Sequence, residues 1–176
     1  MSEDRKEAWL QWVALTTTIL AVAAAISSLK ASAYSTRVKI GATKEANQWA
    51  YFQSKSIKEH SYQLNRDILA ASRLMATGNQ EAGDFLAAKI KEYESEIARY
   101  DREKGEIKQQ AERLQNDQES LKLHNVNFSM AVMLLQIAIM LSAVGALIKK
   151  KFSWLMGLAI GLVGLLYMVN GFLLLI

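Results

Sequence analysis

The sequence contains no cysteine and no proline, and long stretches of it carry no charge. Without cysteine, the chain can form no disulfide, no thiolate metal site and no thiol nucleophile. Without proline, it lacks the residue that most strongly breaks helices, which favours long uninterrupted helices. The net charge of +4 is small, and almost all of the excess is the run Lys149, Lys150 and Lys151, so a nucleic-acid-binding role has little support.

Three segments of 22 to 26 residues contain no Asp, Glu, Lys or Arg; they lie between Glu7 and Lys30, between Lys122 and Lys149, and from Phe152 to Ile176. At about 1.5 Å per residue, a helix of such a length crosses a hydrocarbon core of roughly 30 Å. The alternation that a membrane β-barrel requires is missing, so we expect the spans to be helices. The leader Met1–Glu7 mixes acids with bases, which is not typical of a cleaved signal peptide.

The predicted fold is therefore all-α. We expect an integral membrane protein with three transmembrane helices and a long antiparallel, coiled-coil-like helical hairpin outside the bilayer. The expected segments are an N-terminal tail (1–7), transmembrane helices (8–29, 126–148 and 152–176), the extramembrane hairpin (30–125, with its tip near 77–80) and a short basic loop (149–151).

Heptad spacing dominates the second arm of this hairpin. Steps of four and three residues connect Leu86, Ile90, Tyr93, Ile97, Tyr100, Lys104, Ile107, Ala111, Leu114, Gln118, Leu121, Asn125 and Phe128. The series continues into the second span, which predicts one continuous helix through both. Its polar members, Lys104, Gln118 and Asn125, would help to set register and oligomer number.

A weaker series predicts the contact face of the first arm: Ile57, Ser61, Leu64, Ile68, Ala71 and Met75. Between the two series lies Thr77-Gly78-Asn79-Gln80, where Gly78 or Asn79 can adopt the left-handed conformation that ends a helix. No break is recognisable near Lys30 either, so we expect two very long helices closed by a third short one. Residues 30–76 carry eight bases against three acids, and residues 80–125 eight against eleven, so the arms should attract each other.

Three motifs resemble a known family: Asn47-Gln48-Trp49-Ala50-Tyr51-Phe52-Gln53-Ser54-Lys55-Ser56-Ile57-Lys58, then Leu135-Gln136-Ile137-Ala138-Ile139, and the lysine run followed by Trp154. Over nearly its whole length the chain is similar to a family of uncharacterised bacterial inner-membrane proteins, a domain of unknown function. The resemblance implies this membrane architecture and location. It implies no activity, ligand or catalytic residue.

The short basic loop gives the clearest signal for orientation. Lys149, Lys150 and Lys151 lie between two spans, and such loops stay cytoplasmic. Aromatic residues open the first and third spans, which predicts that the N-terminus shares the lysine side and that the hairpin is periplasmic. The bases after the first span oppose this orientation; they are Lys30, Arg37, Lys39 and Lys44.

No pattern of residues indicates an enzyme or a cofactor. His60 and His124 lie at opposite ends of a predicted arm, so they cannot share a metal within one subunit. No glycine-rich phosphate loop, nucleophile elbow or apolar carboxylate pair is recognisable. We therefore predict no catalytic, cofactor-binding or metal-binding residues.

Small residues instead predict close helix packing, within the chain and between copies. In the third span they are Gly157, Gly161, Gly164 and Gly171; in the first, Ala14, Thr18, Ala21, Ala25 and Ser28; in the second, Ala138, Ser142 and Gly145. Gln136 and Asn170 are polar at membrane depth, and such residues usually face a partner, a cavity or a pore. Because neither is ionisable, we interpret them as hydrogen-bonding contacts between helices.

Trp49, Tyr51 and Phe52 present three aromatic rings on successive helix faces, which makes them a candidate partner surface or a contact with the second arm. The favoured function is a non-enzymatic homo-oligomeric membrane scaffold whose partners are other copies of itself and lipids. One alternative is an oligomeric channel or transport accessory lined by Gln136 and the threonines Thr16, Thr17 and Thr18. Another is a membrane-anchored adaptor or sensor that binds a further protein through the hairpin.

Overall fold

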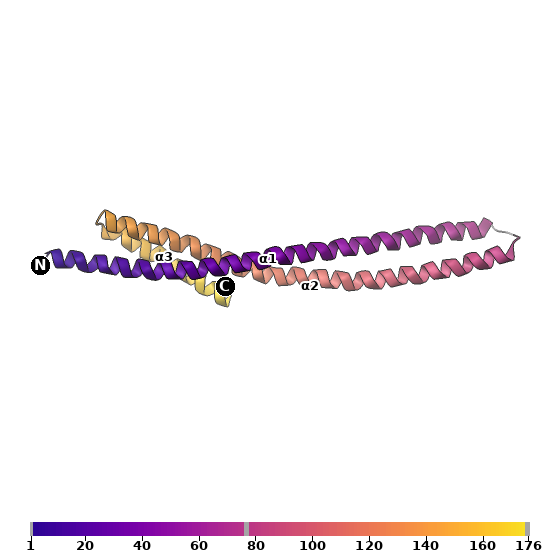
Figure 1. Ribbon diagram of the computed structural model, residues 1–176, viewed down its shortest axis with the longest axis horizontal. Helices are drawn as coiled ribbons and strands as arrows, with labels where there is room; N and C mark the ends of the chain where they lie inside the picture. Colours follow the sequence, from indigo (N-terminus) through magenta and orange to yellow (C-terminus); the bar gives the residue numbers. More distant parts are fainter. Residues whose placement is uncertain (1, 76–77, 175–176) are drawn as a thin grey trace. The chain divides into compact units, whose positions relative to one another are not determined.

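The computed structural model describes residues 2–75 and 78–174, and within them it contains three α-helices and no β-strand (Figure 1). Helix α1 is Ser2–Met75, α2 is Gln80–Leu147 and α3 is Lys151–Leu173. All three are long and apolar enough to cross a membrane. The predictions of an all-α chain and of two very long helices followed by a short one are confirmed.

The turn between α1 and α2 is built by Gly78 and Asn79. Gly78 has a φ of 116°, which glycine adopts without the steric cost that a Cβ atom imposes. The side-chain oxygen of Asn79 then accepts a hydrogen bond of 3.1 Å from the Ala82 backbone N–H, which caps the start of α2. Thr77 of the predicted turn, like Leu175 and Ile176 at the predicted end of the last span, lies outside the described residues.

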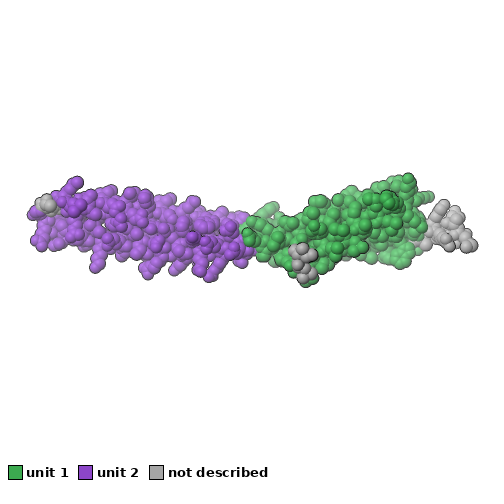
Figure 2. Space-filling view, turned by 180° about the vertical axis from the view of Figure 1, so that it is seen from behind, with its two compact units in different colours: residues 1–40, 118–176 green, residues 41–117 purple. Residues whose placement is uncertain are grey.

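The chain forms two compact units (Figure 2). Unit 1 comprises residues 1–40 and 118–176, and unit 2 comprises residues 41–117. In unit 1, the first part of α1, the last part of α2 and all of α3 form a three-helix bundle. Its core consists of Leu20 and Ala23 from α1 with Leu135 and Ala138 from α2, against which α3 packs Ile160, Leu165 and Met168.

In unit 2, α1 and α2 pair side by side and antiparallel. Gln48 on α1 donates a hydrogen bond of 2.7 Å to Gln110 on α2, whereas Lys55, further along α1, contacts Glu103, which lies earlier on α2. Every position in the heptad series of α2 is buried or half-buried, from Leu86 to Phe128. The periodicity therefore identified the inner face of α2.

The predicted contact face of α1 is wrong. All six of its positions are exposed, including Ile57 at 68% and Met75 at 83%. The α1 residues that face α2 are aromatic or long and charged, among them Phe52, Lys55, Glu59, Tyr62 and Arg66. Such side chains bury apolar stems and rings while their polar ends find partners, so a search for aliphatic residues selected the opposite face.

Candidate interaction surfaces

The glycine face of α3 packs within unit 1. The four buried residues of α3 are Gly157, Gly161, Gly164 and Gly171. A Cβ atom added to Gly157 would lie 2.7 Å from the Ser142 hydroxyl oxygen, and one added to Gly161 would lie 2.9 Å from a methyl carbon of Leu20. This face is therefore occupied by α1 and α2, and a neighbouring copy would have to use other surfaces.

The small residues of α2 also pack against other parts of unit 1. Ser142 is completely buried, and a Cβ atom on Gly145 would lie 2.8 Å from the backbone nitrogen of Trp154. By contrast, Ala14, Thr18, Ala21, Ala25 and Ser28 of α1 are all exposed. The small stripe of α1 thus stays open on the surface of unit 1.

The two polar residues that the sequence predicts at membrane depth, Gln136 and Asn170, have different surroundings. Asn170 on α3 donates a hydrogen bond of 3.1 Å from its amide nitrogen to the side-chain oxygen of Asn127 on α2. This contact joins α2 and α3 of one chain, and its two residues are buried or half-buried. Gln136, in contrast, is exposed on the outside of unit 1.

One end of unit 1 gathers tryptophan and lysine. The rings of Trp9 and Trp154 lie 6.3 Å apart, and Trp154 donates a hydrogen bond of 3.2 Å from its ring nitrogen to the hydroxyl of Thr16. The ammonium group of Lys151 lies 5.9 Å from the Trp9 ring. Lys149 and Lys150 are exposed in the loop between α2 and α3, where Lys149 has a φ of 55°.

The other end of unit 1 is an aromatic cluster around His124. The His124 ring stacks on Tyr34 at 4.7 Å, and its Nδ1 lies 2.7 Å from the carbonyl oxygen of Gly171. Phe128 contacts Phe172 edge-on at 4.9 Å. His124 therefore fixes the end of α3 against α1 and α2, which is a structural role; His60 is exposed in unit 2.

A shallow groove of about 350 Å³ opens between α1 and α2 in unit 1. Its lining is small and uncharged: Ser28, Ala31, Ser32, Ser35, Asn125, Ser129 and Val132. Hydroxyl and amide groups can exchange hydrogen bonds, but nothing in this lining selects a particular ligand.

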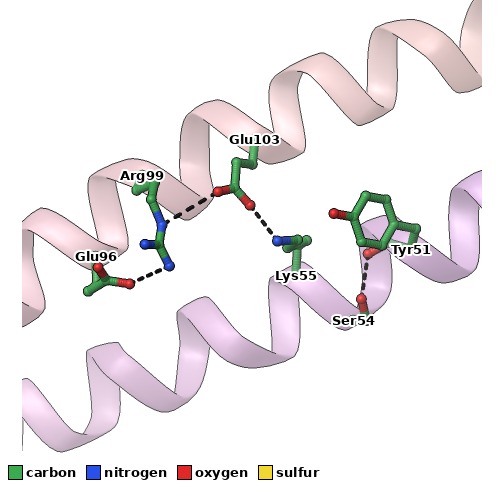
Figure 3. A network of polar contacts seen from close by, with 6 residues as sticks. All are labelled: Tyr51, Ser54, Lys55, Glu96, Arg99 and Glu103. Atoms are coloured by element: carbon green, nitrogen blue, oxygen red, sulfur yellow. Dashed lines mark hydrogen bonds and ion pairs between the residues drawn. The ribbon is translucent and has the colours of Figure 1, made fainter.

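Charged side chains link the two helices at the centre of unit 2 (Figure 3). Lys55 on α1 lies 2.5 Å from a carboxylate oxygen of Glu103 on α2, and Arg99 lies between Glu96 at 2.6 Å and Glu103 at 3.4 Å. The hydrogen bond from Lys55 holds the pKa of Glu103 below its ordinary value. The same bond raises the pKa of Lys55, against the smaller opposing effect of burial.

Lys104 forms a second ion pair across unit 2, with Glu59 of α1. Their side chains are only 18% and 11% exposed, and Lys104 also lies over the Phe52 ring at 5.9 Å. Lys104 therefore breaks the apolar series of α2 because an acid faces it on α1. Glu59 was not among the predicted contact residues because the predicted inner face of α1 was wrong.

Aromatic rings fill the space next to these ion pairs. Tyr62 of α1 lies 5.3 Å from Tyr93 and 5.7 Å from Tyr100 of α2, measured between ring centres. Within the candidate partner surface, Trp49 and Phe52 are half-buried and contact each other at 5.7 Å, whereas Tyr51 is exposed. The three aromatic residues thus do not form a single open patch.

The exposed face of α1 in unit 2 carries an unpartnered apolar stripe. We define the α1 outer stripe as Ile57, Ser61, Leu64, Ile68, Ala71 and Met75, all of which are exposed. Ile57 precedes the inner residue Glu59 by two positions, which at 3.6 residues per turn places it about 160° round the helix axis. The stripe therefore faces directly away from α2.

Among the described residues, no group of three or more His, Asp or Glu side chains is arranged to hold a metal ion.

The fold and these surfaces define an all-helical chain with three helices suited to crossing a membrane. Residues 9–174 match the family described as "Domain of unknown function (DUF4337)", and the chain belongs to this family. Searches of curated proteins and of solved structures each find no match.

Proposed function

We propose that the protein is a non-enzymatic homo-oligomeric scaffold of the bacterial inner membrane, with unit 2 projecting from the bilayer as a helical hairpin. The α1 outer stripe carries this proposal. It presents Ile57, Leu64, Ile68 and Met75, each more than half exposed, on a unit that is otherwise rich in charge. Aliphatic residues repeated at heptad spacing on an exposed helix face are typical of a surface that another helix covers.

Unit 1 supports membrane insertion through the positions of its end clusters. Trp9 belongs to the tryptophan and lysine end, and Lys30 lies over the Phe172 ring at 5.5 Å at the other end. The 22 residues from Trp9 to Lys30 on α1 correspond to roughly 30 Å of helix, the thickness of a hydrocarbon core. Aromatic and basic residues at both limits are typical of the two membrane interfaces.

The exposed surface of unit 1 also favours assembly. Ala14, Thr18, Ala21 and Ala25 form a small, open stripe on which another helix could pack closely. Gln136 would expose its amide group to lipid in a single chain, which is unfavourable unless a partner or water satisfies it. Both features are accommodated if copies lie side by side in the bilayer.

The particle mass in detergent or lipid nanodiscs tests this proposal. We expect more than one chain per particle, and we expect Leu64→Gln combined with Ile68→Gln to lower that number without loss of helix content. Leu74→Gln is the matched control, because Leu74 is 81% exposed but lies outside the stripe. A wild-type particle that contains a single chain would overturn the proposal.

Gln136 also motivates a second candidate, an oligomeric channel or transport accessory. An exposed amide on α2 could line a water-filled axis in a ring of copies. Purified oligomers reconstituted in planar bilayers should then conduct ions, and Gln136→Leu should reduce the current. Oligomers that give no current above that of protein-free bilayers would exclude this candidate and leave the scaffold proposal intact.

A further inference from the structure

Unit 2 has a second exposed heptad stripe, on the face of α2 that points away from α1. We define the α2 outer stripe as Ala88, Lys91, Ser95, Ala98, Arg102 and Gly105, all of which are exposed. Arg102 follows the buried Tyr100 by two positions, so this stripe also lies about 160° from the inner face of its helix. Four of its six side chains are small, whereas the α1 outer stripe presents four large aliphatic ones.

Gly105 is the residue of this stripe that the single chain explains least. A glycine within a helix costs about 0.5–1 kcal/mol relative to alanine. The glycines of α3 have close neighbours that a Cβ atom would meet at 2.7 to 3.1 Å, but a Cβ atom on Gly105 would meet nothing within 4 Å. A contact with another molecule would explain the glycine, since a helix that packs against α2 at this position could approach its backbone closely.

Charge indicates which face of another copy fits. The exposed charged residues of α1 within unit 2 are three bases and one acid: Lys44, Lys58, Arg73 and Asp67. The exposed charges of α2 within unit 2 are eight acids and five bases. Summed over the part of each helix that lies in unit 2, the exposed charge is therefore +2 on α1 (three bases minus one acid) and −3 on α2 (five bases minus eight acids), and within the α2 outer stripe itself the charged residues are Lys91 and Arg102. Two α1 helices of neighbouring copies would repel each other, whereas an α1 helix and an α2 helix attract; such complementarity selects the partner helix more than it adds affinity.

We infer that the α1 outer stripe of one copy packs against the α2 outer stripe of the next copy, with the large aliphatic side chains of α1 over the small residues of α2. This inference rests on the proposed assembly and specifies its contact. The contact joins two different faces, so it is heterologous: a pair of copies keeps one free stripe of each kind, and further copies add until a ring closes or an open row forms. An isologous α1–α1 dimer would leave both α2 stripes uncovered.

The antiparallel pairing within unit 2 gives the register between copies. From Gln48 to Lys55 on α1, the partner on α2 moves back by the same seven residues, from Gln110 to Glu103. Copies inserted side by side in one bilayer lie at the same depth, so the same levels apply between them. Six residues beyond Lys55, Ser61 should therefore lie level with residues 97 and 98 of the neighbouring α2.

Cysteine crosslinking in membranes tests this contact, and the natural chain has no cysteine to interfere. Ser61→Cys and Ala98→Cys are small changes at exposed positions. Within one chain the two sites lie on outward faces, roughly 13 Å or more apart, whereas a disulfide requires Cα atoms within about 7 Å. We expect the double variant to form dimers, trimers and higher products on oxidation, each single variant to form none, and the two single variants expressed together to form dimers only.

Ser61→Cys with Ala88→Cys is the matched control, because Ala88 lies on the same stripe but about 15 Å from Ala98, nearer the start of α2. It should give no more crosslinking than the single variants. Dimers from Ser61→Cys alone would replace the inferred contact with an α1–α1 contact. Multi-chain particles in which the double variant does not crosslink would overturn the inference and leave the proposed assembly standing, whereas single-chain particles would overturn both.

Discussion

At the scale of single residues, glycine has opposite meanings in the two units. In unit 1 there is no space for a side chain at Gly157: a Cβ atom would lie 2.7 Å from the Ser142 hydroxyl and 2.8 Å from the carbonyl oxygen of Ala138. We expect Gly157→Ala to lower the free energy of unfolding by about 1–3 kcal/mol, as overpacking of a close helix contact does. In dissociated single chains, Gly105→Ala should instead raise it by about 0.5–1 kcal/mol, because the site is open within the chain. Thermal unfolding followed by circular dichroism compares the two, and similar responses would contradict the assignment.

Also at this scale, Glu103 and Lys55 make the pairing of α1 and α2 sensitive to pH. The lowered pKa of Glu103 means that its contribution to stability is present above the usual glutamate pKa of about 4.3 and is lost as the pH falls through the lowered value. The raised pKa of Lys55 means that its contribution is present below about 10.4 and is lost as the pH rises through the raised value.

We therefore expect a thermal midpoint that is flat near neutral pH and decreases in acid. Glu103→Gln should reduce the acid-dependent part of that decrease, because an amide at this position does not titrate. Circular dichroism melts of both proteins between about pH 7 and pH 3 measure the difference. Identical acid profiles would show that the Lys55–Glu103 contact contributes no pH dependence.

At the scale of helices, the sequence predicted α2 better than α1 for a physical reason. The inner face of α2 contains Leu, Ile and Tyr at heptad spacing, so its apolar periodicity and its contact face coincide. On α1 the periodic aliphatic residues Ile57 and Leu64 face outward, while Glu59 and Tyr62 face α2. The polar contacts that select this face involve residues far apart in sequence, which a search along one helix does not detect.

The ion pair of Glu59 with Lys104 can be tested as a register device between α1 and α2. Glu59→Lys would place two ammonium groups together in a poorly exposed site, and Lys104→Glu would do the same with two carboxylates. Each change should cost about 1–3 kcal/mol, and the double reversal should restore most of that loss. The coupling energy of the four proteins, measured by denaturant unfolding, isolates the contact. A coupling energy near zero would mean that the neighbouring aromatic rings set the register alone.

For the whole molecule, composition was enough to predict three apolar helices, because charge-free segments of membrane length are visible in the sequence. Composition did not predict which surfaces of these helices pack within the chain. Glycines and alanines in all three spans looked equally suited to packing between copies, yet the glycines of α3 and the residues Ser142 and Gly145 of α2 pack within unit 1. Ala21 and Ala25 of α1, in contrast, are exposed. Only the three-dimensional arrangement separates these uses, because each depends on which helix faces which.

The orientation of the proposed membrane protein is the remaining property that one experiment decides. Lys149, Lys150 and Lys151 are exposed in a short loop, which favours a cytoplasmic loop and a periplasmic turn at Asn79. An impermeant thiol reagent should therefore label Asn79→Cys in intact cells. Leu147→Cys, which is 82% exposed beside the lysines and leaves their charge unchanged, should be labelled only after lysis. The reverse pattern would mean that Lys30, Arg37, Lys39 and Lys44 outweigh the short loop. In that case unit 2 would be cytoplasmic, and any partner of its exposed surfaces would have to be sought there.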